Sequence, residues 1–255
     1  MIFINNETIA GVPTLHVVDR EKELEKLPTV FFLHGYTSAK EHNLHIAYIL
    51  ATKGFRVLLP DAVYHGERQK TEQNRDLKFW EIVLTSIHEL ELLKEHMVKN
   101  GLGNDQIGVI GTSMGAITMY GALARYPWIT SAVSFMGTAY YQVFLEEQLK
   151  ALETKGVDLH DLRHEVLHQI KPYDLTAQLE RLNGRPLMIW HGKEDQVVPY
   201  PFSEKLFGEL ERHYEEHPHR LKFVAEDRVD HKVSRKAVLS SVEWFEQHLL
   251  KDQIS

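Results

Sequence analysis

The sequence of 255 residues contains no cysteine. Disulfide bonds, thiolate nucleophiles, cysteine-ligated zinc and iron–sulfur clusters are therefore excluded. The absence also fits a reducing compartment. The N-terminal segment (1–18) has no basic stretch ahead of an apolar run, so no signal peptide is expected. From these two features we expect a cytoplasmic location.

Long hydrophobic runs and an excess of positive charge are also missing. No segment approaches the roughly 18 unbroken apolar residues of a membrane span, so no membrane partner is expected. The formal net charge is −7, which disfavours nucleic acid because phosphate neutralisation needs a basic face. Neither a P-loop nor a G-x-G-x-x-G motif occurs, so nucleotide binding has no support, and we expect no cofactor.

What the chain does contain is an alternation of short apolar segments with amphipathic ones. This alternation predicts an α/β fold with a mostly parallel central sheet flanked by helices. The stretch up to Val18 predicts one or two antiparallel strands at the sheet edge. Further strands are predicted at 28–33, 55–59, 107–110, 131–136, 186–190 and 221–225, and helices at 44–53, 79–99, 114–125, 175–182 and 232–250.

One segment interrupts the alternation. Residues 139–171 have a helical pattern and no strand. A helical insertion after the sixth strand would lie above the carboxyl ends of the strands, where open α/β sheets bind ligands. We therefore predict one domain over 1–255 with a small helical cap at about 139–171.

The strongest chemical signal is Gly-Thr-Ser-Met-Gly at 111–115. It follows a predicted strand and opens a predicted helix, which is the context that gives G-x-S-x-G its meaning. A serine in such a turn has a strained backbone, and its hydroxyl is exposed at the top of the sheet. Ser113 is therefore the predicted nucleophile, and the alternative is a plain glycine-rich turn.

A serine hydroxyl needs a base, and the base needs an acid that orients it. In this strand–turn–helix arrangement the chain order is serine, acid, histidine. Asp195 follows the strand at 186–190 and is the predicted acid. Its neighbour Glu194 is the competing candidate, and Asp195 could instead cap the helix that starts near Pro199.

The predicted base is His231, which follows the last strand and a short polar loop. Such a loop at the top edge of the sheet can place an imidazole over Ser113. Asp230 is an alternative orienting acid, although adjacent side chains usually point apart. His217 and His219 precede the last strand and are expected at the opposite end of the sheet.

Two backbone N–H groups are expected to stabilise the oxyanion of the tetrahedral intermediate. Met114 supplies one from the start of its helix, and Tyr36 supplies the other from the loop at 34–38. The Tyr36 ring can also line the pocket. His34 could act as a second base, but we expect it to pack beneath the loop.

Five motifs appear in the order found in α/β-hydrolases: H-G-Y-T-S, D-A-V-Y-H-G-E-R, G-T-S-M-G, H-G-K-E-D-Q-V-V-P and D-H-K-V-S. Over nearly the whole chain the sequence resembles the dienelactone-hydrolase and prolyl-oligopeptidase-like branch of that superfamily, and in particular its small bacterial esterases. The resemblance implies the α/β-hydrolase fold and a Ser113–Asp195–His231 triad. It also implies the Tyr36 and Met114 oxyanion amides and no cofactor. A dienelactone hydrolase proper uses a cysteine nucleophile, so that activity does not fit.

The implied activity is that of a serine carboxylesterase acting on small short-acyl esters. A peptidase, thioesterase or deacetylase of the same fold is the alternative, as is an inactive hydrolase fold that serves as a binding protein. The expected partner is a small-molecule ester, and self-association into a homo-oligomer stays open.

Two further patterns have competing interpretations. His160, His164 and His168 share one face of the predicted cap, as metal ligands can, but a solvated stripe is favoured and no metal is expected. Residues 61–68 end a strand and could either contact substrate or form a structural loop through Glu67 and Arg68.

Overall fold

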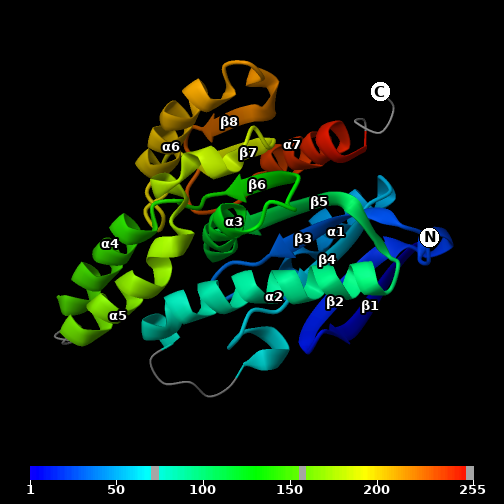
Figure 1. The fold of residues 1–255 in the computed structure, drawn as a ribbon, viewed down its shortest axis with the longest axis horizontal. Helices are drawn as coiled ribbons and strands as arrows, with labels where there is room; N and C mark the ends of the chain where they lie inside the picture. Colours follow the sequence, from blue (N-terminus) through cyan, green and yellow to red (C-terminus); the bar gives the residue numbers. More distant parts are fainter. Residues whose placement is uncertain (70–74, 155–158, 251–255) are drawn as a thin grey trace.

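The computed structural model describes residues 1–69, 75–154 and 159–250. An eight-stranded sheet crosses it in the order β1-β2-β4-β3-β5-β6-β7-β8 (Figure 1). Neighbouring strands are parallel along the part of the sheet formed by β4, β3, β5, β6, β7 and β8, whereas β2 is antiparallel to both of its neighbours. This arrangement confirms the predicted mostly parallel sheet with an antiparallel edge. The strands are β1 Ile2–Ile9, β2 Val12–Asp19, β3 Leu27–Leu33, β4 Arg56–Pro60, β5 Gly103–Thr112, β6 Ser131–Phe135, β7 Leu187–Gly192 and β8 Leu221–Glu226.

Helices cover both faces of the sheet. Every residue of β3 and β4 is buried, as the continuous apolar runs require of central strands. One face packs against α1 (Leu44–Thr52) and α7 (Arg235–Phe245), and the other against α2 (Phe79–Lys99), α3 (Met114–Arg125) and α6 (Pro201–Glu211). Within the described ranges, no helix is both long and apolar enough to cross a membrane.

The segment after β6 is helical, as predicted. It forms α4 (Tyr141–Glu153) and α5 (His160–Ile170), which contact each other. Figure 1 shows the two helices projecting beyond the sheet at one end of the molecule, beside the start of α2. α5 also contacts α2.

The predicted helix at 175–182 is wrong. Two short 3₁₀ turns occupy it instead, at Leu175–Ala177 and Leu179–Leu182. The Asp174 carboxylate accepts from the Thr176 N–H and starts the first turn, but Gln178 then has φ −154° and ψ 47°, which no helix continues through. The last helix also starts later than predicted, because the Ser234 hydroxyl caps it by accepting from the Ala237 N–H.

Candidate active site

Ser113 lies in a strained turn between β5 and α3. Its φ of 53° and ψ of −115° place it in the left-handed half of the backbone map, which is costly for a residue with a Cβ. The turn depends on both flanking glycines. A Cβ at Gly111 would overlap the carbonyl of Gly115, and one at Gly115 would overlap the carbonyl of Leu33. The sequence therefore encodes this conformation through the two glycines of the motif.

The structure brings Ser113, His231 and Asp195 together in one hydrogen-bonded row. His231 Nε2 lies 2.9 Å from Ser113 Oγ, and His231 Nδ1 lies 2.6 Å from Asp195 Oδ2. Because a carboxylate only accepts, Nδ1 carries the proton, and Nε2 is free to accept from the serine hydroxyl. This is the arrangement in which an imidazole can remove the proton of a serine nucleophile.

The Asp195 carboxylate is buried and fully engaged. Its Oδ1 accepts from the backbone N–H groups of Val197 (2.8 Å) and Val198 (3.0 Å), and its Oδ2 accepts from His191 Nε2 (3.1 Å) as well as from His231. Burial by itself would raise the pKa of Asp195, but the hydrogen bonds from the two histidines and the two amides outweigh it and hold that pKa well below its ordinary value. The acid is therefore ionised at neutral pH.

His191 was not predicted from the sequence. It is fully buried one residue before the end of β7, and its Nδ1 lies 2.7 Å from Ser203 Oγ. Its position four residues before Asp195 was the only available signal, and nothing in the pattern indicated that both side chains turn to the same side.

Backbone contacts join the acid loop to the histidine loop. The Glu194 N–H donates to the Val229 carbonyl (3.0 Å), and a Cβ at Gly192 would overlap that same carbonyl. The competing acids Glu194 and Asp230 are both exposed, and the carboxylate that is hydrogen-bonded to the His231 ring is that of Asp195. The competing histidines lie elsewhere: His217 and His219 flank Pro218 in a 3₁₀ turn at the opposite end of β8.

The loop after β3 lies beside the nucleophile, because Leu33 pairs with Gly111 across the two parallel strands. The backbone N–H groups of Tyr36 and Met114 have no hydrogen-bond acceptor among the described residues. The Tyr36 hydroxyl donates to Asp76 (2.7 Å), and burial together with that carboxylate raises the pKa of Tyr36 to about 12. Both amides are therefore available as donors, and the ring stays a neutral wall.

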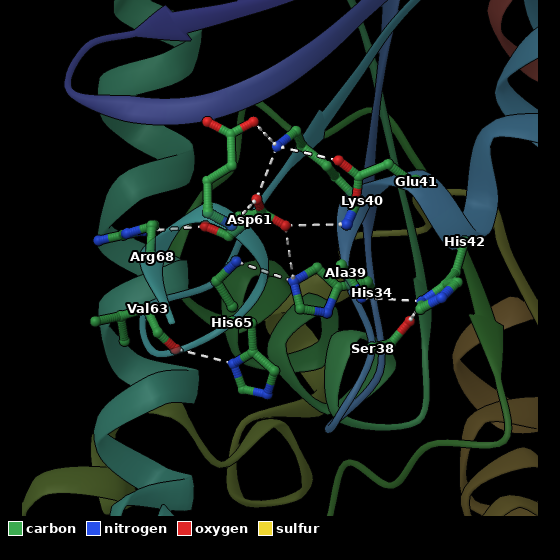
Figure 2. Close-up of polar contacts among 12 residues, drawn as sticks. His34, Ser38, Ala39, Lys40, Glu41, His42, Asp61, Val63, His65 and Arg68 are labelled. Atoms are coloured by element: carbon green, nitrogen blue, oxygen red, sulfur yellow. Dashed lines mark hydrogen bonds and ion pairs between the residues drawn. The ribbon is translucent and has the colours of Figure 1, made fainter. Parts of the chain in front are cut away.

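Residues 61–68 pack against this loop as a structural element (Figure 2). The buried Asp61 carboxylate accepts from the backbone N–H of Lys40 (3.0 Å), from Lys40 Nζ (2.9 Å) and from the Glu67 N–H (3.0 Å). Arg68 forms two bonds of 2.8 Å with Glu89 of α2. Of the two interpretations, the contacts favour the structural loop.

His34 packs beneath its loop, as expected, and is 2% exposed. Its Nε2 accepts from the Ala62 N–H (3.0 Å), and its Nδ1 donates to the Gly35 carbonyl (2.8 Å). Burial lowers the pKa of His34 to about 4, compared with 6.5 for an unperturbed ring. The folded protein therefore needs this imidazole to be neutral.

This pKa predicts an acid-sensitive stability. The unfolded chain binds the proton first, so the stabilisation is complete above pH 6.5 and is lost as the pH falls toward 4. We expect His34 to lower the free energy of unfolding by about 3 kcal/mol between pH 7 and pH 4 in urea titrations. Asp61, whose pKa is lowered from 3.8, acts only below that window. The variant His34→Gln keeps an acceptor that does not titrate, so an equally steep loss in that variant would contradict the prediction.

A pocket of about 450 Å³ opens at Ser113. Apolar side chains form most of its walls, and α4 supplies one of them. Two carboxylates, Asp76 and Glu147, are also on its surface. The lining residues are Tyr36, Asp76, Phe79, Ser113, Ile117, Phe144, Glu147, Gln148, Ala151, Leu152, Gln196, Val197, Val198 and Pro199.

Of the cap histidines, neither His164 nor His168 lines this pocket. His164 and His168 are exposed on α5, and the side chain of His160 lies outside the described residues. In the part of the chain that is described, no group of three or more histidine and acidic side chains is placed to hold a metal ion.

Comparison with known proteins places this geometry in context. Residues 42–252 match the sequence model of the prolyl oligopeptidase family. The Bacillus subtilis protein YitV, which is named as an esterase by inference, is 45% identical over 98% of this chain and 100% of its own length. Esterase YjfP of Escherichia coli is 32% identical, again over 98% of this chain and 100% of its own length.

Solved structures share the fold. The Thermus thermophilus protein TT1662 superposes with a TM-score of 0.76 at 23% identity, over 98% of this chain and 99% of that one. A cold-adapted esterase from an Arctic intertidal metagenomic library gives a TM-score of 0.66 at 17% identity, over 96% of this chain and 93% of that one. These similarities confirm the α/β-hydrolase fold.

Proposed function

We propose that this chain, which belongs to the prolyl oligopeptidase family of serine hydrolases, is a carboxylesterase. In this proposal it cleaves small esters through an acyl-enzyme on Ser113. One observation carries the proposal: the row Ser113–His231–Asp195, with contacts of 2.9 and 2.6 Å, stands at a pocket large enough for a small ester.

The first half of the reaction forms the acyl-enzyme. His231 Nε2 takes the hydroxyl proton as Ser113 Oγ attacks the ester carbonyl carbon, and the carbonyl oxygen becomes an oxyanion. The Tyr36 and Met114 amides donate to that oxygen. The intermediate then expels the alcohol oxygen, which receives the proton held on His231 Nε2 and leaves as a neutral alcohol.

The second half repeats the same proton movements with water. His231 removes a proton from water as the water oxygen attacks the acyl carbon, and the returning proton goes to Ser113 Oγ when the carboxylic acid departs. Throughout, the Asp195 carboxylate holds the Nδ1 proton and stabilises the imidazolium that forms at each step. The ester, water and this chain's own residues are sufficient for the steps described.

The pocket supports a preference for short acyl groups, because the cap helix α4 forms one of its walls and limits the length of the acyl chain that fits. Gln148, Ala151 and Leu152 of α4 line the pocket, and Ala151 leaves space because its side chain is a single methyl group. Trp80 Nε1 donates to Gln148 Oε1 (2.9 Å), which fixes this part of the wall.

We therefore expect Ala151→Trp to shift the acyl-length preference toward shorter chains. The ratio of kcat/KM for p-nitrophenyl acetate to that for the hexanoate should rise at least about tenfold, since even one methylene that no longer fits an apolar pocket is worth roughly 1–3 kcal/mol. Lys150→Trp is the matched control, because Lys150 is exposed on the same helix and does not line the pocket. An unchanged ratio, or the same change in both variants, would remove the acyl-pocket assignment, and absence of any ester turnover in the wild type would refute the proposed function.

A further inference from the structure

Two buried histidines beside the nucleophile have no part in the proton relay. His34 lies in the loop after β3 and His65 in the loop at 61–68, and their ring centres are 5.2 Å apart. Figure 2 shows both rings between these loops, with His65 bonded to the carbonyl of Val63.

His65 links the loop that carries Tyr36 to the loop at 61–68. The backbone N–H of Thr37 donates to His65 Nε2 (3.2 Å), and His65 Nδ1 lies 2.9 Å from the Val63 carbonyl. A carbonyl only accepts, so the ring proton is on Nδ1, and Nε2 presents a lone pair. His65 is therefore a neutral acceptor for a backbone amide, and its acceptor role excludes a proton at Nε2.

The amide that it holds belongs to a strained residue. Thr37 has a φ of 62°, which is costly for a β-branched side chain. Such a conformation persists only where its surroundings enforce it. Thr37 directly follows Tyr36, so the peptide unit that His65 fixes adjoins the residue whose N–H is the proposed oxyanion donor. The Tyr36 ring also packs edge-on against His65, with ring centres 5.5 Å apart.

We propose that His65 is a positioning residue for the oxyanion hole: by accepting from the strained Thr37 amide, its neutral imidazole aims the Tyr36 N–H at the substrate's carbonyl oxygen. The inference rests on the proposed function. The inference goes beyond that function by assigning to the 61–68 loop a role in the chemical step, although none of these residues lines the pocket at Ser113.

Protonation of His65 would abolish this role, because Nε2–H would then face the Thr37 N–H. Burial lowers the pKa of His65, and Arg75 acts in the same direction, while the bond to Val63 and the nearby Asp61 oppose them. The rings of His34 and Tyr36 also pack against His65. The enzyme is thus expected to lose activity in acid as His65 takes up a proton.

Three variants test the proposal with p-nitrophenyl butyrate as substrate. His65→Leu removes the acceptor, whereas His65→Gln places an amide oxygen near the position of Nε2 and does not titrate. His42→Leu is the matched control, because His42 Nδ1 also accepts a backbone N–H, from Ala39 (3.2 Å), but in an exposed turn. Circular dichroism and fluorophosphonate labelling verify folding and count active sites in each variant.

At pH 8 we expect His65→Leu to lower kcat about 10- to 100-fold with KM within about twofold of the wild type, since a misdirected oxyanion donor costs transition-state stabilisation and not ground-state binding. His65→Gln should stay within about fivefold of the wild-type kcat, and His42→Leu within about twofold. As the pH is lowered below neutrality, log kcat/KM should decrease more steeply in the wild type than in His65→Gln.

Equal kcat values in His65→Leu and the wild type would overturn the inference and leave the proposed function standing. Equal losses in the Leu and Gln variants would also overturn it. If His65→Leu does not fold, the pH profiles decide instead: an equally steep decrease of log kcat/KM at low pH in His65→Gln and in the wild type would overturn the inference. A wild-type enzyme without ester turnover would instead refute the proposed function itself.

Discussion

Replacing Ser113 with alanine is expected to lower kcat/KM for p-nitrophenyl butyrate by at least about 10,000-fold. The variant has no Oγ to attack the carbonyl, and His231 Nε2 loses the donor that now lies 2.9 Å away. Residual turnover can come only from oxyanion stabilisation and water. Alanine keeps a Cβ at φ 53°, so the strain of the turn is unchanged, and the melting temperature should stay within a few degrees.

A second serine–histidine pair offers a matched control. Ser38 Oγ lies 2.9 Å from His42 Nδ1, but His42 is exposed and has no carboxylate partner among the described residues. Ser38→Ala should therefore keep wild-type turnover and react fully with a fluorophosphonate probe, whereas Ser113→Ala should not react. Substantial turnover in Ser113→Ala would exclude the nucleophile assignment. Failure of the wild type to react with the probe would favour an inactive hydrolase fold that serves as a binding protein.

The fold was predictable wherever a local pattern decides the structure. The uninterrupted apolar runs that became β3 and β4 are buried on both faces, and the three-and-four spacing of Trp80, Val83 and Ile87 became the buried side of α2. The relay could also be anticipated, because parallel strands place their carboxyl ends at one edge. Residues that follow β5, β7 and β8 must therefore gather there.

What escaped prediction depends on partners that are distant in sequence. His65 meets Thr37 across 28 positions, and the spacing of the chain gives no sign of that contact. His191 and Asp195 share a hydrogen bond only because the turn after β7 reverses direction. The wrong helix at 175–182 has a local cause of a different kind: the Asp174 side chain competes for the Thr176 backbone N–H, and an apolar spacing alone does not reveal that competition.

The second large effect is expected for Asp195→Asn, which should lower kcat about 1,000- to 10,000-fold. The direction of the new amide is set by its surroundings. The Val197 and Val198 N–H groups both point at Oδ1, so the asparagine oxygen must take that place, and its NH₂ group must take the place of Oδ2. The NH₂ then donates to His231 Nδ1, where the carboxylate now accepts at 2.6 Å.

A donor at that position inverts the proton arrangement of the base. His231 must hold its proton on Nε2, the atom that should accept from Ser113 Oγ, so the ring cannot remove the hydroxyl proton. Glu194→Gln is the matched control, because it neutralises the adjacent exposed carboxylate and should leave kcat within about twofold. KM should change little in either variant, since the lost interaction matters in the transition state. Asp195→Asn with kcat within tenfold of the wild type, or a loss of comparable size in Glu194→Gln, would show that the imidazole does not depend on Asp195 for its orientation.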